Sequence, residues 1–161
     1  MGLGEAKLRE FGSGDAESVR ELIHSTIEAC YMGAYPARAV EYFLRYHSES
    51  EILSRAVAGT TIVAEAGGQI VATGTLKGHH ILGVFVGREF QGRGLGRRIM
   101  EALEKRARAE GIAEITLDVS LPSRAFYERM GYQGFEPAVV DVGEGQRLEY
   151  WKASKRVDPF S

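Results

Sequence analysis

The sequence predicts a mixed α/β domain whose central sheet has about seven strands, mostly antiparallel, with about four helices around it. Strand-like and helix-like stretches follow one another in the order βααβββαβαββ, and strands with no helix between them favour antiparallel pairs. One strand–helix–strand unit over residues 81–119 predicts a parallel pair within the same sheet. The length of 161 residues is typical of a single domain, which we expect to span residues 1–161.

The N-terminal third predicts one strand and two helices. Residues 7–11 alternate between apolar and polar side chains, as in a short strand. Asp15 can cap a helix that runs to Cys30, because the apolar residues between them recur at spacings of three and four. After a break, a second helical stretch carries Val40 and extends to Leu53.

The middle of the chain predicts three strands in succession. Residues 60–66 and 69–77 are apolar and β-branched, and they flank a two-residue turn of Gly67 and Gly68. Glycine suits this turn because it tolerates the positive φ angles of tight hairpins. The third strand, residues 81–86, begins a short distance further on.

The C-terminal half begins with a strongly amphipathic helix. The helix starts near Leu95 and ends at Gly111, since glycine commonly follows the last helical turn. A strand, a short helix and two further strands are predicted at residues 112–119, 123–130, 138–142 and 148–153.

Composition and charge exclude several classes of function. The formal charge of −2 gives no general attraction to nucleic acid or to an anionic membrane. The single cysteine, Cys30, can form neither an internal disulfide nor a cysteine-built zinc site, and we expect no metal. We see no signal peptide and no apolar run of about eighteen residues. We therefore expect a cytoplasmic protein in which Cys30 is a reduced thiol.

A glycine-rich loop between the strand at 81–86 and the following helix carries the strongest functional signal. Its glycines at 92, 94 and 96 allow helix N-terminal amides to approach an anion closely. Residues 88–108 contain seven Lys or Arg and three Asp or Glu, a local charge of +4. These features favour a phosphate-bearing ligand. A tight strand-to-helix turn would also need glycines, so the loop alone leaves that interpretation open.

Two other phosphate-binding motifs fit poorly. A P-loop requires a lysine and a hydroxyl residue after its last glycine, and neither is present. A dinucleotide fingerprint requires the spacing Gly-x-Gly-x-x-Gly, whereas these glycines alternate with single residues. Asp118 lies at a suitable distance for the ribose contact of that motif, but no other feature supports it.

The order Gln91-x-x-Gly94-x-Gly96, between an apolar strand and an amphipathic helix, resembles the GNAT superfamily of acetyl-CoA-dependent N-acetyltransferases. Residues 126–132, Phe-Tyr-Glu-Arg-Met-Gly-Tyr, resemble the second signature of that family and follow at the expected separation. The resemblance covers residues 7–153. It implies a GNAT-like fold, acetyl-CoA as co-substrate and acetyl transfer to a primary amine by direct attack in a ternary complex.

The resemblance also implies how acetyl-CoA is held. The strand before the loop splays from its neighbour and pairs its main chain with the pantetheine arm, while the loop amides hold the pyrophosphate. Ser120 stands where many relatives have an asparagine, so either this serine or Ser123 takes its place. The implied cofactor-binding residues are Val84, Phe85, Val86, Gln91, Gly92, Arg93, Gly94, Leu95, Gly96, Arg97, Ser120 and Ser123.

Two residues match the catalytic positions of the family. Tyr127 corresponds to the general acid that protonates or hydrogen-bonds the leaving thiolate. His80 lies eleven residues before Gln91, where the family often has its general base, and it can accept a proton directly or through water. Without the resemblance, Tyr127 is equally typical of a core aromatic and His80 of a solvated strand end.

The acceptor is less well defined by the sequence. The segment after the first helix contains Tyr31 and Tyr35, which we predict to bind the substrate, and more aromatic residues follow. The same residues would suit a helix pair that covers the sheet. We expect a small-molecule or peptide amine as acceptor, and the resemblance allows a homodimer. A non-catalytic acyl-CoA-binding module and a nucleotide-binding regulator remain as alternatives.

Overall fold

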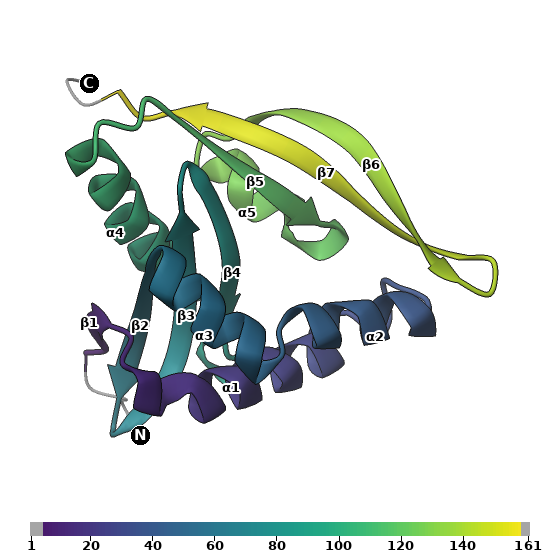
Figure 1. Ribbon diagram of the computed structural model, residues 1–161, viewed down its shortest axis with the longest axis horizontal. Helices are drawn as coiled ribbons and strands as arrows, with labels where there is room; N and C mark the ends of the chain where they lie inside the picture. The colour runs from purple at the N-terminus through teal and green to yellow at the C-terminus, as the bar shows by residue number, and fades with distance from the viewer. Residues whose placement is uncertain (1–4, 159–161) are drawn as a thin grey trace.

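A computed structural model describes residues 5–158 as one seven-stranded sheet flanked by helices (Figure 1). The expected domain of residues 1–161 therefore includes seven terminal positions, 1–4 and 159–161, outside the described residues. The strands are β1 (Lys7–Glu10), β2 (Thr60–Ala66), β3 (Gln69–Lys77), β4 (His80–Val86), β5 (Glu114–Ser120), β6 (Gln133–Gly143) and β7 (Gln146–Arg156). The helices are α1 (Ala16–Cys30), α2 (Ala37–Tyr46), α3 (Glu49–Ala58), α4 (Leu95–Ala109) and α5 (Arg124–Arg129).

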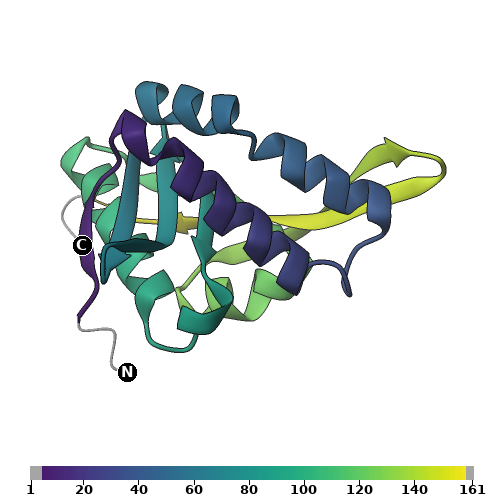
Figure 2. The ribbon, with the colours of Figure 1, turned by 90° about the horizontal axis from the view of Figure 1, so that it is seen from below.

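The sheet separates two apolar clusters, one on each face. Helices α1, α2 and α3 cover one face, and α4 and α5 cover the other (Figure 2). Neighbouring strand residues point to opposite faces, so Val63 of β2 joins the cluster of α1 to α3 while Ala64 joins that of α4. Ile23 and Ile99, each fully buried, are central members of the two clusters. Among the described residues, none of the helices combines the length and apolar character needed to cross a membrane.

The strand order is β1-β2-β3-β4-β5-β7-β6, and β4 and β5 form the one parallel pair among the described strands. This pair is very short, because only His80↔Thr116 and Ile81↔Leu117 are in register. Beyond Ile81 the two strands diverge, which divides the sheet into two halves (Figure 1). The edge of β4 over residues 82–86 is thus left without a partner in β5.

A β-bulge in β4 lies where the strands diverge. Thr75 pairs with Leu82 and Thr73 with Phe85, so Gly83 and Val84 stand opposite one residue of β3. Gly83 has a φ of 64°, and a Cβ built there would lie 2.7 Å from Nη2 of Arg55. Glycine at this position therefore serves both the backbone conformation of the bulge and the close approach of the arginine.

The predicted order of elements is confirmed, with one correction. The stretch expected to be a single helix to Leu53 forms two helices, so the described chain has five α-helices. The break falls at His47 and Ser48, because Ser48 is extended and its Oγ accepts a hydrogen bond from the amide of Glu51 at 3.3 Å. This serine is the N-cap of α3. The last two strands are also longer than predicted, with eleven residues each.

We expect Gly83→Ala to destabilise the protein by about 2–4 kcal/mol, because it combines a positive φ with a clash against Arg55. Gly78→Ala is the matched control, since Gly78 has a φ of 62° but nothing within 4 Å of a built Cβ. Urea unfolding monitored by circular dichroism measures both free energies of unfolding. Equal losses in the two variants would contradict the role of the contact with Arg55.

Candidate active site

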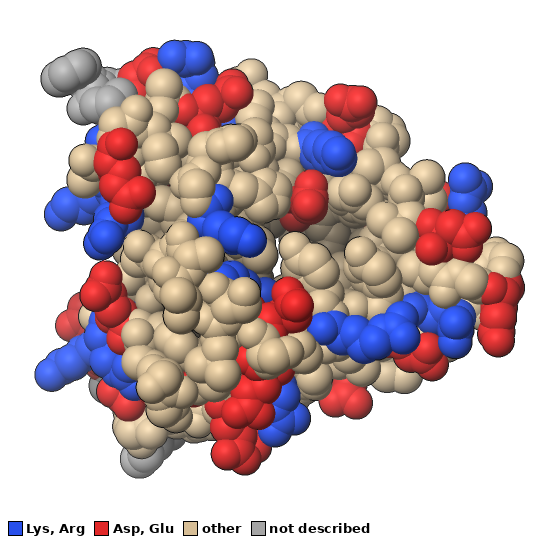
Figure 3. Space-filling model, in the orientation of Figure 1, with Lys and Arg blue, Asp and Glu red and all other residues tan. Residues whose placement is uncertain are grey.

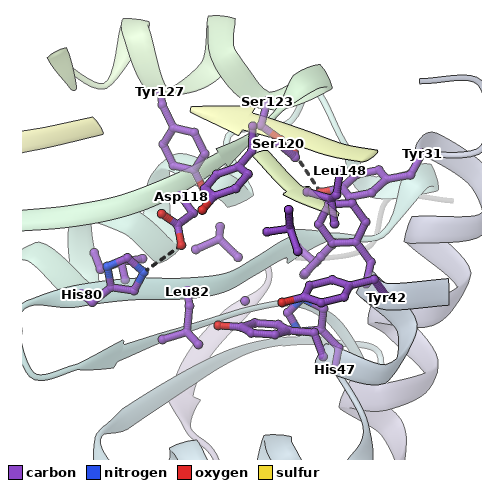
Figure 4. Close-up of a pocket in the computed structure, with 18 residues that line it drawn as sticks. Tyr31, Tyr42, His47, His80, Leu82, Asp118, Ser120, Ser123, Tyr127 and Leu148 are labelled. Carbon is purple, nitrogen blue, oxygen red and sulfur yellow. Dashed lines mark hydrogen bonds and ion pairs between the residues drawn. The ribbon is translucent and has the colours of Figure 1, made fainter. Parts of the chain in front are cut away.

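Two pockets lie on either side of the divergence between β4 and β5. We call the first the loop pocket; it is bordered by residues 84–86 of β4, the glycine-rich loop, the start of α4, and residues 122–129. The second is the aromatic pocket, bordered by β4, β5, α2 and β7 (Figure 4). Figure 3 shows the molecule hollowed near its centre, with uncharged residues and several acidic and basic side chains around the hollow. The two pockets share Tyr31, Val84, Phe85, Ser123 and Tyr127, so they meet at these residues.

The glycine-rich loop is shaped for an anion. Gly92 and Gly94 have φ angles of 78° and 82°, and Gly94 is the N-cap of α4. No side-chain hydrogen bond caps this helix, so its first amides have no such partner, and they carry the positive end of the helix dipole. The side chain of Gln91 donates to the carbonyl of Val86 at 2.9 Å and ties the loop to β4.

Most of the predicted cofactor-binding residues come together in the loop pocket. Arg93 does not line either pocket; its guanidinium lies 6.0 Å from the ring centre of Phe90. Ser120 lines the aromatic pocket instead. The predicted residues that line the loop pocket are Val84, Phe85, Val86, Gln91, Gly92, Gly94, Leu95, Gly96, Arg97 and Ser123.

Ser120 and Ser123 belong to one hydrogen-bond chain at the junction of the pockets. The hydroxyl of Tyr31 donates to Ser120 at 3.0 Å, and the two serine hydroxyls lie 2.7 Å apart (Figure 4). This chain links the end of α1 to the end of β5. Tyr31, predicted to bind substrate, therefore lies at the junction and holds the two serines in place.

Tyr35, the other predicted substrate residue, does not line either pocket. Its hydroxyl accepts from the amide of Leu121 at 2.9 Å and donates to the carbonyl of Glu149 at 2.8 Å. Burial raises the pKa of Tyr35 to about 12, so the hydroxyl keeps its proton at neutral pH. These two hydrogen bonds connect the segment between α1 and α2 to the segment between β5 and α5 and to β7.

Tyr127 lies at the meeting point of the pockets and is buried. Its ring packs edge-on against Phe126 and Tyr132, with centroids 5.0 and 5.8 Å away. Tyr132 donates to Glu104 at 2.8 Å, and this buried carboxylate also binds Lys155. Burial raises the pKa of Tyr127, so it stays protonated at neutral pH. The arrangement holds a proton donor firmly where the two pockets join.

His80 begins β4 at the edge of the aromatic pocket. Its Nδ1 lies 2.8 Å from the hydroxyl of Thr116, and its Nε2 lies 3.7 Å from Oδ2 of Asp118 (Figure 4). The short parallel register between His80 and Thr116 creates this arrangement. A histidine oriented by a hydroxyl and a carboxylate can accept a proton from a ligand in the pocket.

From the sequence, Asp118 was interpreted only as a possible ribose contact. The alternation of β5 could have indicated its place in the pocket, because it puts Thr116, Asp118 and Ser120 on the face opposite to Ile115, Leu117 and Val119. The aromatic residues that follow Tyr35, namely Tyr42, Phe43 and Tyr46, line the aromatic pocket, and the rings of Tyr42 and Tyr46 stack with centroids 6.3 Å apart. His47 and Tyr150 also line this pocket, although the sequence does not single them out.

In chemical terms the site offers a loop whose main-chain amides can bind an anion, a strand edge without a partner in β5, a buried tyrosine hydroxyl and a histidine that can accept a proton. Within the described residues, no cluster of three or more His, Cys, Asp or Glu side chains suits a metal ion. One ligand can lie along β4 from the loop pocket, and a second can reach the same junction from the aromatic pocket.

Comparisons with solved structures identify this architecture. A GCN5-related N-acetyltransferase from Rhodopseudomonas palustris is 26% identical and superimposes with a TM-score of 0.86 over 97% of this chain and 98% of that one. The PaiA N-acetyltransferase of Thermoplasma acidophilum, solved with coenzyme A, is 19% identical, with a TM-score of 0.76 over 94% and 99% of the chains. At that identity the likeness concerns the fold.

Sequence comparisons give shorter matches. An uncharacterized acetyltransferase of Streptococcus pyogenes serotype M1 is 38% identical over 56 residues, which are 35% of this chain and 39% of that protein. A glucosamine 6-phosphate N-acetyltransferase of Arabidopsis thaliana is 32% identical over 81 residues, covering 44% of this chain and 54% of the relative. The chain thus spans only part of these curated relatives. The family model described as Acetyltransferase (GNAT) domain matches residues 31–143, and the chain belongs to the GNAT acetyltransferase family.

Proposed function

We propose that this protein transfers an acetyl group from acetyl-CoA to a primary amine by direct attack in a ternary complex. The observation that carries the proposal is the meeting of two pockets at Tyr127, between the free edge of β4 and the residues His80 and Asp118. One pocket suits the cofactor and the other the amine. The membership in the GNAT family supports the assignment.

The chain has the donors that acetyl-CoA requires. The unpaired edge of β4 over residues 82–86 can pair with the amide groups of the pantetheine arm as an added strand would. The amides at the start of α4, together with Arg97, suit the pyrophosphate. Ser123 lies at the reactive end of this path. Acetyl-CoA supplies the acetyl thioester.

The residues at the junction divide the chemistry between them. His80 takes the proton from the ammonium, directly or through water, so that the nitrogen lone pair can attack the thioester carbonyl. A main-chain amide near Phe85 or Val86 stabilises the negative charge that develops on the carbonyl oxygen. As the C–S bond breaks, Tyr127 donates its proton, or a hydrogen bond, to the departing thiolate, and the second proton that the attacking nitrogen loses restores the Tyr127 hydroxyl directly or through water. Much of the rate comes from positioning the amine against the thioester.

The acceptor is a small-molecule or peptide amine, and the reaction takes place in the cytoplasm. The aromatic pocket supports a small acceptor, because rings border it on several sides. The relative from Arabidopsis acts on glucosamine 6-phosphate by its name, which is also a small amine. The homodimer that the resemblance allows stays a prediction.

We expect Tyr127→Phe to lower kcat about 10- to 100-fold while the KM for acetyl-CoA changes little, because only the proton donor is removed. Thiol release in a coupled assay measures both constants. Tyr35→Phe is the matched control: it loses two buried hydrogen bonds and so unfolds more easily, but it keeps its kcat. Unchanged kcat in Tyr127→Phe would contradict the acid assignment. Binding of acetyl-CoA without turnover of any amine would favour a non-catalytic module.

We expect His80→Gln to lower kcat/KM about tenfold or more near pH 7, where the amine must lose a proton. The loss should shrink as the pH approaches about 10, because an alkyl amine then deprotonates without help. His79→Gln provides the control, since His79 is the exposed neighbour and does not line the aromatic pocket. A loss that is constant across the pH range would show that His80 is not the base.

A further inference from the structure

Arg55, on α3, lies directly behind the floor of the aromatic pocket. Its residue is only 6% exposed, and its guanidinium lies so close to Gly83 that a built Cβ would be 2.7 Å from Nη2. Gly83 and His47 both lie against this guanidinium, and both line the pocket. A positive charge is thus held one residue away from the space that an acceptor would occupy.

This buried charge lacks a compensating anion in the described part of the chain. Nη1 donates to Nδ1 of His47 at 2.9 Å, whereas Nε is buried with no hydrogen-bond partner there. No carboxylate of residues 5–158 forms an ion pair with Arg55. Glu51, one turn earlier on α3, is exposed, and with the Tyr46 hydroxyl it only partly offsets the burial that lowers the pKa of Arg55. An unpaired buried charge is costly, so a ligand that supplied an anion would be favoured.

His47 connects this charge to the pocket. Burial, with help from the charge of Arg55, lowers the pKa of His47 to about 3, so its ring is neutral at neutral pH. An arginine can only donate, so Nδ1 of His47 accepts and the one ring proton resides on Nε2. The main-chain oxygen of His47 also lies 2.9 Å from Nε2 of His24, which holds the segment in place. His47 is therefore a hydrogen-bond donor with a cation behind it, a pair suited to an oxyanion.

The opposite side of the pocket has the opposite character. Asp118 and His80 lie on one side of the cavity, and His47 and Tyr42 lie on the other (Figure 4). Burial raises the pKa of Tyr46, and the charges of Arg55 and Asp118 act on this pKa in opposite directions, so Tyr46 lies within the field of both. Aromatic rings line the space between the two ends. The pocket is therefore polarised, with a carboxylate near the reaction centre and a cation at the far end.

We propose that the acceptor is an amine that also carries an oxyanion, a carboxylate or a phosphate, which binds at His47 in the field of Arg55. Its ammonium group lies at the Asp118 end, near Tyr127 and His80. Arg55 acts through His47 and the shape of the pocket floor, as a specificity-determining residue. This inference rests on the proposed acetyl transfer and narrows its substrate class.

The first test compares matched acceptors with the wild-type protein. The series is 5-aminopentanoate, its neutral counterpart 5-aminopentanamide, pentylamine and 3-aminopropyl phosphate, each assayed by thiol release from acetyl-CoA. We expect kcat/KM to be about tenfold or more higher for an anionic acceptor, because a site built for a polar group rejects analogues that lack it. Comparison of 5-aminopentanoate with 3-aminopropyl phosphate shows whether the site prefers a carboxylate or a phosphate. Equal or better turnover of the neutral acceptors would overturn the proposal.

The second test changes the charge. Arg55→Gln should reduce the preference for the anionic acceptor to near one, mainly through a higher KM, while Arg55→Lys should retain part of it. Arg45→Gln, at an exposed position of α2, is the control and should keep the full preference. Equal losses on anionic and neutral acceptors in Arg55→Gln would show a purely structural role and would overturn the proposal.

Two readouts separate the possible failures. Thermal stabilisation by CoA shows that each variant folds. If Arg55→Gln does not fold, the wild-type series and Arg55→Lys decide. A preference for the anionic acceptor that is present in the wild-type protein and smaller in a folded Arg55→Lys supports the proposal, whereas an equal preference in the two proteins, or none in the wild type, overturns it. If no amine of either class is acetylated, the proposed function fails; if neutral amines are acetylated as well as anionic ones, only the inference about substrate class fails.

Discussion

The early separation of β4 from β5 is the constraint on which the site depends. Two residue pairs, His80↔Thr116 and Ile81↔Leu117, are enough to fix the direction of the two strands, and beyond them the sheet opens. The opening leaves main-chain groups of β4 without a strand partner, a state that costs free energy unless a ligand or solvent satisfies them. It also admits side chains from α1, α2 and α5 between the halves. Both pockets are consequences of this single interruption.

The bulge in β4 makes the interruption compatible with a continuous strand. Gly83 and Val84 occupy the space of one residue, which changes the direction in which the following residues face. Val84 and Phe85 therefore contribute to both pockets, while Gly83 leaves room beneath the strand for Arg55. The same glycine that allows the bend also allows a charge to approach the pocket floor.

Local patterns predicted the elements well because short-range rules decide them. The strands at 60–66 and 69–77 match their predicted bounds, and the glycine-rich loop and the helix after it lie where the motif indicated. The break between α2 and α3 was missed although its signal, Ser48 followed by Glu51, is present in the sequence. The pairing of His80 with Asp118, and of His47 with Arg55, could not be predicted, since each depends on register or helix packing. Tyr35 lies in the segment that the sequence predicted to bind substrate, but its hydroxyl bonds the main chain of Leu121 and Glu149 and the residue does not line either pocket.

Glu104 and Arg55 are buried charged residues on opposite faces of the sheet, and their different bonding partners indicate different roles. Glu104 is 3% exposed, yet Tyr132 and Lys155 both bind it, so its charge is compensated within the chain. Its effect is structural, because it fixes the ring against which Tyr127 packs. Arg55 is almost as deeply buried, but a neutral imidazole is the partner that the described residues give it. A buried charge without a partner of opposite sign is costly, and this one lies behind the pocket that faces the reaction centre. Glu104 and Arg55 are buried to a similar depth, so their partners decide the interpretation. The paired Glu104 stabilises the fold, and the unpaired Arg55 is the residue that we propose to favour an anionic acceptor.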